Sequence, residues 1–253
     1  MAVTPRPIHI GIGGWDYDPW RGTFYPPGLP RAKQLGFASR QVTAIEINAT
    51  FYKLQRPDLF ERWADEVPEG FVFTVKGSRF CTNRKSLGEG GEAVARFCGQ
   101  GFTRLGGKLG PILWQLPETK RFDSEDFAAF LSLLPREQDG VALRHAVEAR
   151  HESFGDERAA ELARAAGAAL CLAEKGGWPP AERGTADFVY ARLMNAREEE
   201  PDGYAPAQLD RWAAQVNAWA EDREVFLFMI DGAKLRAPAA AQALIARVGS
   251  GAR

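Results

Sequence analysis

The chain has 253 residues, of which 45% are hydrophobic and 26% charged, and its formal net charge is −1. This length suits one large α/β domain or two small ones, and the charge excludes a global basic field that would draw the protein to nucleic acid or an anionic membrane. Three cysteines without metal-like spacing favour free thiols in a reducing compartment, and no apolar run approaches the ~20 residues of a membrane span. We therefore expect a cytoplasmic protein with no membrane-spanning segment.

Eight short runs along the chain have the composition of β-strands. They cover residues 8–12, 44–47, 71–75, 111–116, 141–149, 169–173, 188–193 and 224–230. The loop after the first run is rich in aromatic residues, beginning with Trp15. These rings either fill a hydrophobic layer or line a ligand surface, and packing is the simpler interpretation for each residue taken alone.

Segments with helical spacing of apolar residues separate nearly all of these runs. The expected helices cover residues 30–40, 57–67, 92–102, 124–134, 156–166 and 207–220, with a last helix ending near residue 248. Pro57 suits a first helical turn, Ser124 is the expected N-cap of its helix, and Gly167 is the expected residue after a helix C-terminus.

Strands alternating with helices over ~250 residues are typical of a (β/α)8 barrel. We predict a single domain over residues 1–253, with an α/β fold that forms a TIM-like (β/α)8 barrel. A doubly wound open sheet is the main alternative, but the turn GIGGWDY after the first strand lacks a G-x-G-x-x-G fingerprint that leads straight into a helix.

Polar side chains recur near the C-terminal ends of the expected strands. Glu46 lies inside the apolar run 44–47, where a carboxylate is costly unless it is paired. The candidate pocket residues are Trp15, Glu46, Asn48, Tyr52, Lys76, Arg79, Gln115, Glu148, Arg150, His151, Arg192 and Asp231. Ligand chemistry in a TIM barrel sits at the C-terminal strand ends, so we expect these side chains to converge on one polar pocket.

Three of these residues are candidate catalytic groups. His151 is the best single candidate for proton transfer, the alternative being a structural histidine bonded to a loop carbonyl. Glu46 and Glu148 would act as an acid/base pair, as in glycoside hydrolysis, if their carboxyl groups lie ~5–9.5 Å apart. The alternative for Glu46 is an internal salt bridge, to Lys76 or Arg192.

The cationic candidates suit the binding of an anion. Burial would lower the pKa of Lys76 towards that of a nucleophilic amine, whereas a neighbouring carboxylate would cancel this effect, and we favour a charged lysine that binds an anion. With Lys76, the guanidinium groups of Arg79, Arg150 and Arg192 would form a clamp for a phosphate or carboxylate group. The alternative is that one or two of them neutralise Glu46 and Glu148.

The sequence predicts no metal and no cofactor. It has three histidines and no H-x-H or H-E-x-x-H motif, so a histidine-rich metal site is not expected. An oxygen-rich Mg²⁺ or Mn²⁺ site formed by Glu46, Glu148 and Asp231 is the alternative.

Several motifs stand in order along the chain. They read GIGGWDYDPWRGTFYPPGLP, IEINATFY, FTVKGSRF, LGPILWQLP and Glu-x-Arg-His at residues 148–151. Together they resemble the DUF72 (YecE-like) family over roughly residues 8–248. The resemblance implies a TIM-barrel-like fold with an open polar pocket, and the family's name records that its biochemical role is not settled.

The chain departs from the pattern of that family around the pocket rim. Asn83 and Met194 stand where a histidine is common in the family, and Glu174 stands where an aspartate is common. Met229 and Ile230 replace a polar asparagine pair. These differences remove ligand-capable side chains and argue against a shared metal-dependent activity in this chain.

The predicted function is that of an enzyme acting on a small anionic substrate, phosphorylated or sugar-like. The alternative is a nucleic-acid or nucleotide binding protein without catalysis, whose basic rim would comprise Arg79, Arg84, Lys85 and Arg150. A catalytically silent barrel is a third interpretation. The sequence gives no oligomeric state.

Overall fold

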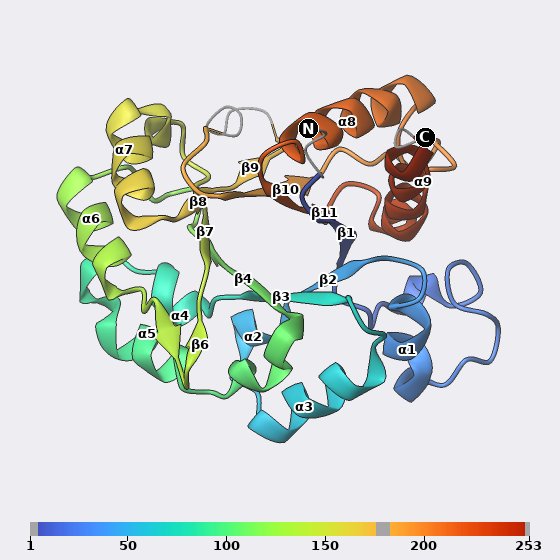
Figure 1. Cartoon of the computed structure of the whole chain (residues 1–253), viewed down its shortest axis with the longest axis horizontal. Helices are drawn as coiled ribbons and strands as arrows, with labels where there is room; N and C mark the ends of the chain where they lie inside the picture. The colour runs from blue at the N-terminus through green and yellow to red at the C-terminus, as the bar shows by residue number, and fades with distance from the viewer. Residues whose placement is uncertain (1–4, 176–182, 251–253) are drawn as a thin grey trace.

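The computed structural model describes residues 5–175 and 183–250. Its parallel strands form a sheet that curls around a central axis, and helices lie outside the sheet (Figure 1). The strand order is β8-β7-β4-β3-β2-β1-β11-β10-β9. These strands are β1 (Ile8–Gly13), β2 (Ala44–Ile47), β3 (Val72–Lys76), β4 (Leu109–Gln115), β7 (His145–Glu148), β8 (Ala169–Leu170), β9 (Leu172–Ala173), β10 (Phe188–Leu193) and β11 (Glu224–Met229).

One strand of the barrel is interrupted at Cys171. The expected strand 169–173 is divided into β8, which pairs with β7, and β9, which pairs with β10. Cys171 donates its backbone N–H to the carbonyl of Val147 at 2.9 Å, so the chain crosses from one neighbour to the other without leaving the sheet. The prediction of a single α/β domain with a TIM-like barrel is confirmed.

Another predicted strand is only half correct. We expected residues 141–149 to form one strand, but β6 (Val141–Ala142) pairs antiparallel with β5 (Glu137–Gln138) in a hairpin outside the barrel. Asp139 and Gly140 have φ values of 53° and 76° at its tip, as a two-residue Asp-Gly turn requires. Only β7 enters the barrel.

The predicted α-helices appear in the predicted order, together with two short ones at residues 49–52 and 79–82 that the sequence did not predict. They are α1 (Gln34–Ala38), α2 (Ala49–Tyr52), α3 (Pro57–Glu66), α4 (Arg79–Thr82), α5 (Gly91–Cys98), α6 (Ser124–Leu133), α7 (Glu157–Ala166), α8 (Pro206–Trp219) and α9 (Ala237–Ser250). Short 3-10 helices cover Asp18–Trp20, Arg31–Lys33, Gly88–Gly90, Phe102–Lys108, Glu152–Gly155 and Lys234–Arg236. Within the described residues, no helix is both long and apolar enough to cross a membrane.

Two of the three predicted helix ends are observed, so the local sequence was sufficient to predict them. Pro57 is the first residue of α3, and Gly167 ends α7 with a φ of 68°, as expected. The N-cap of α6 is Asp123 and not Ser124, because the Asp123 carboxylate accepts the backbone N–H groups of Glu125 and Asp126.

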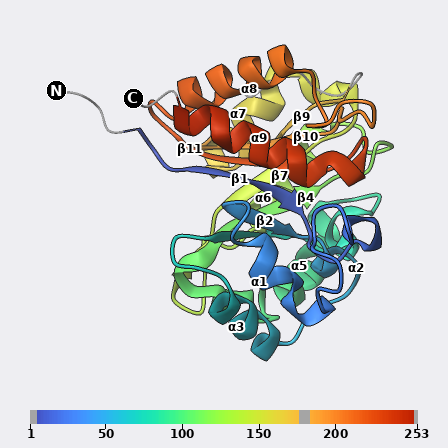
Figure 2. The same ribbon diagram turned by 90° about the vertical axis from the view of Figure 1, so that its right-hand side faces the viewer.

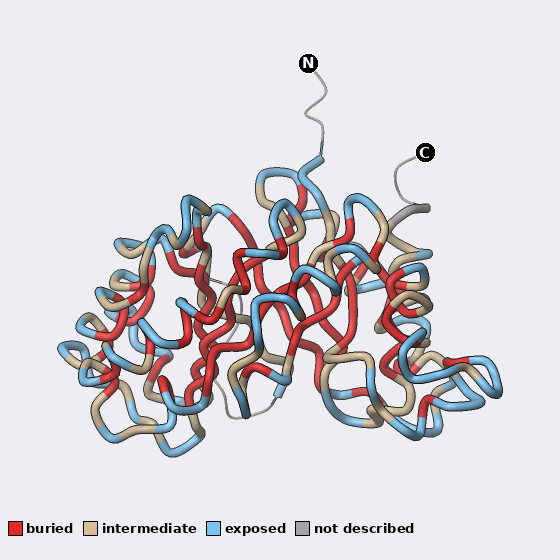
Figure 3. Tube along the Cα trace, turned by 90° about the horizontal axis from the view of Figure 1, so that it is seen from below, coloured by how far each residue is buried: buried red, intermediate tan, exposed pale blue. Residues whose placement is uncertain are grey.

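The barrel has two buried layers, because alternate strand residues face the helices or the barrel axis. Large apolar side chains fill the outer layer, and α8 and α9 pack together over β1 and β11 (Figures 1 and 2). Figure 3 shows burial concentrated along the strands and exposure along the outer helices. Inside the barrel, aromatic rings fill much of the interior: Phe188, Tyr190, Phe226 and Phe228. Charged side chains are therefore placed towards the two ends of the barrel interior.

Candidate functional site

Two buried carboxylates from distant strands bind one arginine. The guanidinium of Arg192, on β10, donates to both Glu46 oxygens, with Nη2–Oε1 and Nε–Oε2 distances of 3.0 and 3.1 Å. Its Nη1 donates to Glu148, on β7. All three residues are at most 1% exposed. The predicted convergence of strand ends is therefore observed for β2, β7 and β10.

Each carboxylate also has further partners. The hydroxyl of Tyr190 donates to Glu46 Oε2 at 2.8 Å, and it lies 2.9 Å from the hydroxyl of Thr74. Glu148 Oε1 accepts the side-chain amide of Gln115 at 2.9 Å and Nε of Arg150. The hydrogen-bonding capacity of both carboxylates is thus largely used by the protein itself.

These contacts fix the protonation of the acidic groups. Burial alone would raise the pKa of Glu148, but the guanidinium groups of Arg192 and Arg150 outweigh burial and hold that pKa below its usual value. Burial and the charge of Glu46 raise the pKa of Tyr190 well above its usual value. Tyr190 is therefore a hydrogen-bond donor, and Glu148 is ionised at neutral pH.

Lys76 lies at the end of β3 beside these groups and has no such partner. Its side chain makes no hydrogen bond or ion pair with another described residue, although the residue is only 8% exposed. Its Nζ lies 4.3 Å from the centre of the Phe51 ring. Burial and the positive charge of Arg192 lower the pKa of Lys76 to about 8, and the two carboxylates offset this only in part.

The backbone around Lys76 is held firmly. The buried hydroxyl of Thr50 donates to the Lys76 carbonyl at 2.7 Å. Gly77 donates its N–H to the carbonyl of Leu113, and a Cβ at Gly77 would lie 2.4 Å from the Trp114 ring. A glycine is therefore needed for the chain to lie against this ring directly after Lys76.

We call Glu46, Lys76, Glu148, Arg150 and Arg192 the mouth cluster, because they lie at or directly beyond the C-terminal ends of their strands. The cluster has three cations and two carboxylates, which leaves one positive charge in excess when Lys76 is protonated. The two carboxylates are bridged by a guanidinium. The space that a glycosidic bond would need between them is therefore taken, which argues against glycoside hydrolysis by this pair.

Two other candidates lie close to strand ends. Asn48 is half-buried, and its side-chain amide donates to the backbone carbonyl of Glu46 at 3.4 Å. His151 is also half-buried and caps the 3-10 helix Glu152–Gly155, where its Nδ1 accepts the backbone N–H of Ser153 at 3.1 Å. This places the proton of a neutral His151 on Nε2.

The remaining candidates lie outside the mouth cluster. The Trp15 ring packs against Trp63 and Phe73 in the layer between barrel and helices, so packing accounts for it. Arg79 and Asp231 are exposed, and the Arg79 guanidinium lies 5.4 Å from the Phe80 ring.

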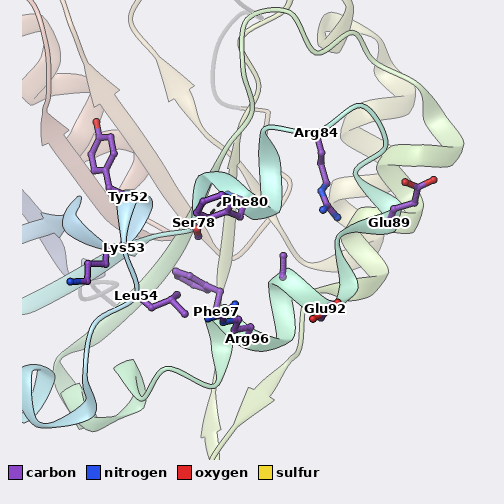
Figure 4. A pocket seen from close by; sticks show the side chains of 11 residues that line it. Tyr52, Lys53, Leu54, Ser78, Phe80, Arg84, Glu89, Glu92, Arg96 and Phe97 are labelled. Carbon is purple, nitrogen blue, oxygen red and sulfur yellow. Dashed lines mark hydrogen bonds between the residues drawn. The ribbon is translucent and has the colours of Figure 1, made fainter.

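Tyr52 lines a second feature, a cavity of about 570 Å³ beside the barrel. We call this the side cavity. Figure 4 shows Tyr52 on one side of it, Arg84 and Glu92 on the other, and Phe80 between them. Tyr52 and Phe80 are 63% and 64% exposed, which is unusual for rings of this size.

No metal site is formed by the part of the chain that the structure describes, since no three of its histidine, cysteine, aspartate and glutamate residues are grouped to hold an ion. Asp231 lies exposed, while Glu46 and Glu148 are bound to Arg192. The oxygen-rich site considered from the sequence would need these carboxylates to leave their guanidinium partner.

The substituted rim positions have structural roles of their own. Glu174 Oε2 accepts the backbone N–H groups of Met194 and Asn195 and the hydroxyl of Tyr204, so it anchors the loop after β10. Met194 is buried, and Asn83 is an exposed residue at the end of α4.

Sequence reasoning missed two polar members of the network, Thr74 and Tyr190. Each stands two residues before a recognised candidate on the same strand, Lys76 and Arg192 respectively. Because side chains alternate along a strand, these positions share the inward face, and the spacing of two was the signal available.

The fold and the charged strand ends define a TIM-like barrel protein with a polar centre at the C-terminal end of its strands. A family model described as "Protein of unknown function DUF72" matches residues 9–253, and the chain belongs to this family.

Two relatives found by sequence similarity have names that state no activity. The UPF0759 protein YunF of Bacillus subtilis is 35% identical over 79 residues, which is 31% of this chain and 27% of that protein. The UPF0759 protein YecE of Escherichia coli is 26% identical over 155 residues, or 58% of this chain and 50% of that protein. These alignments thus span half or less of the relatives' own lengths.

The structural neighbours agree on the fold. A DUF72 family protein of Thermotoga maritima superposes with a TM-score of 0.74 over 97% of this chain and 99% of that one, at 22% identity. A D-psicose 3-epimerase superposes with a TM-score of 0.52 over 96% of this chain and 97% of that one, at 11% identity. At this identity the epimerase shows a shared barrel fold and nothing about chemistry.

Proposed function

We propose that the mouth cluster is the active site of an enzyme that acts on a small anionic substrate, phosphorylated or sugar-like. The observation that carries this proposal is Lys76, a buried cation at the C-terminal end of a TIM-barrel strand that forms no ion pair with any residue the structure describes. An unpaired buried charge lowers stability, so its presence there favours a functional role.

The residues of the cluster would divide the work. Lys76 would bind the anionic group, while Glu46 and Glu148 would orient Arg192. His151 would donate a proton from Nε2, because its Nδ1 is occupied by the Ser153 backbone. Arg150 and Gln115 would fix the position of Glu148.

Thermal-shift titration tests this proposal. Inorganic phosphate and a library of phosphorylated and carboxylated metabolites should raise the Tm of the wild type, since a ligand at 100 times its Kd stabilises by about 2.7 kcal/mol. Lys76→Met should lose this response, and Lys33→Met, which changes an exposed lysine, should keep it. An equal response in Lys76→Met, or no response of the wild type to any compound, contradicts the proposal.

A second candidate function rests on the side cavity. Its exposed Tyr52 and Phe80 rings stand beside Arg84 and Arg96, an arrangement suited to stacking a base and binding its phosphate. Under this alternative the protein binds a nucleotide or single-stranded nucleic acid without catalysis. Calorimetry with a mononucleotide would then show binding that Tyr52→Ala abolishes and Lys76→Met leaves intact.

We place either activity in the cytoplasm. All three cysteines are free thiols, as expected in a reducing compartment.

A further inference from the structure

Lys76 differs from the other two cations of the mouth cluster in whether its charge is paired with a carboxylate. Arg192 and Arg150 are bound to carboxylates, whereas the Lys76 side chain meets the Phe51 ring and no anionic group among the described residues. The carboxylates that could neutralise it are already bound to guanidinium groups. The fold therefore buries an amine and leaves it free to react.

We propose that Lys76 is a covalent nucleophile, whose Nζ condenses with the carbonyl carbon of a small aldehyde, ketone or oxo acid that carries an anionic group. This inference rests on the proposed function and narrows its substrate class from small anions to anionic carbonyl compounds. Two structural features support this proposal. The Lys76 amine lies at the C-terminal end of β3, and the guanidinium groups of Arg150 and Arg192 both bind Glu148, one at each carboxylate oxygen.

The condensation needs no further reactant. The lone pair of neutral Nζ forms a C–N bond, the carbonyl oxygen takes up a proton from water, and Nζ gives up a proton to water, which yields a carbinolamine. Loss of its hydroxyl group as water then gives the imine, so that one amine and one carbonyl become one imine and one water molecule. The imine then takes up a proton from solvent to become an iminium ion.

The charged groups around Lys76 favour this chemistry. Arg192 on β10 and Arg150 after β7 disfavour the ammonium form, while Glu46 on β2 and Glu148 on β7 favour it less strongly than burial and Arg192 oppose it. With a pKa of about 8, about 10% of the amine is neutral at pH 7, against about 0.03% for a lysine of ordinary pKa. Neutral amine is thus about 300 times more abundant than in an exposed lysine.

The charge balance explains why the carbonyl compound should be anionic. A protonated imine carries the single positive charge that the Lys76 ammonium carried, so the cluster has an excess of one cation both before the condensation and after it. An adjacent phosphate or carboxylate of the substrate would remain paired with that charge, in a buried setting where pairing matters most.

Reductive trapping of the wild-type protein tests the inference. The protein is incubated near pH 7.5 with sodium cyanoborohydride and, separately, dihydroxyacetone phosphate, pyruvate or dihydroxyacetone, and the adducts are located by peptide mapping. We expect the two anionic compounds to label Lys76 at least about tenfold more than exposed Lys33, because neutral amine decides the rate. If the exposed lysines are labelled in proportion to their exposure and Lys76 is not labelled, the inference is wrong.

The compounds separate this inference from the proposed function. If phosphate stabilises the wild type but no anionic carbonyl compound is trapped on Lys76, the anion site stands and the nucleophile is refuted. If neutral dihydroxyacetone labels Lys76 as well as its phosphate does, Lys76 is reactive but the anionic substrate class is wrong.

A charge-retaining variant provides the matched control. Lys76→Arg keeps a cation but has no amine that can form an imine, so it should lose the adduct. Adduct of unchanged amount in this variant would place the reactive amine elsewhere and refute the assignment. Peptide mapping of the wild type decides the matter even if the variant folds poorly.

Discussion

The two ends of the barrel interior differ in how completely their buried charges are paired. At the N-terminal end of the strands, Glu224 binds both His9, at 2.9 Å, and Arg144, whose guanidinium also lies over the Phe188 and Phe226 rings. We call His9, Arg144 and Glu224 the floor cluster. Every member of the floor cluster has an opposite charge or a titratable partner, whereas the mouth cluster keeps one cation, Lys76, that pairs with no anion in residues 5–175 and 183–250.

This difference distinguishes buried charges that have a structural role from buried charges that have a functional role. Ion pairs that are complete within the protein can be explained by the need to seal a barrel end with polar side chains. An incomplete set at the end where TIM barrels bind their ligands needs a missing partner, and a substrate anion would be that partner. Removing charges from each end of the barrel in turn tests whether the two ends differ in this way.

The largest expected effect is that of Arg192→Met. It leaves Glu46 and Glu148 buried without a cation between them, and breaking a buried pair by removing one partner costs about 3–5 kcal/mol of unfolding free energy. Arg144→Met at the floor should cost about 1 kcal/mol, because its side chain is 34% exposed. Urea unfolding at pH 7 measures both, and equal losses would remove the distinction between the two ends.

Lys76→Met should act in the opposite direction and stabilise the free protein by about 1–3 kcal/mol at pH 7. The folded pKa of Lys76, about 8, lies below its unfolded value of 10.5, so folding disfavours the ammonium form. This penalty is complete below pH 8 and disappears as the pH rises from about 8 to 10.5. The gain of the variant should therefore vanish over that range in urea unfolding curves.

A paired lysine provides the control for this prediction. Lys108 donates to the backbone carbonyls of Ala64 and Val67 at 2.7 and 2.8 Å, so Lys108→Met should destabilise the protein by about 1–2 kcal/mol. If both methionine variants lose stability, Lys76 has a partner in solution. Every charge of the mouth cluster would then be paired within the protein, and the prediction would be wrong.

The smallest effect should come from Glu224→Gln at the floor, about 1 kcal/mol at pH 7. Burial raises the pKa of Glu224, but its bonds from His9 and Arg144 outweigh burial and lower that pKa below the usual value. Its stabilising effect is thus present above the unfolded pKa of a glutamate and is lost as the pH falls through the lower folded pKa. Wild type and variant should converge in acid, and their Tm responses to phosphate should match.

The fold was largely predictable, and its exceptions have local causes. Eight β-rich runs alternating with helices were sufficient for the barrel, because chain length and the order of elements leave few alternatives. The Asp139-Gly140 pair is a turn signal directly before the apolar run 141–149, and a hairpin forms there in place of the first part of the expected strand. The break at Cys171 had no comparable signal, since it follows from how β8 and β9 share their neighbours.

The sequence predicted where the site lies, but it did not predict which cation pairs with which carboxylate. Strand position and side-chain alternation placed Glu46, Glu148 and Arg192 at one end of the barrel, as observed. Whether Lys76 or Arg192 would neutralise Glu46 depended on the competition between two cations. The planar fork of an arginine can bind two carboxylates at once, and this left none for the lysine.

The most direct test of this account is the titration of Lys76 itself. In protein labelled with ¹³C at lysine Cε, the Lys76 resonance is assigned as the one missing from Lys76→Met, and its chemical shift is followed against pH. We predict a midpoint near pH 8 in the free protein. A midpoint near 10.5, the ordinary value, would show that the Lys76 ammonium is not disfavoured by folding and would contradict the account.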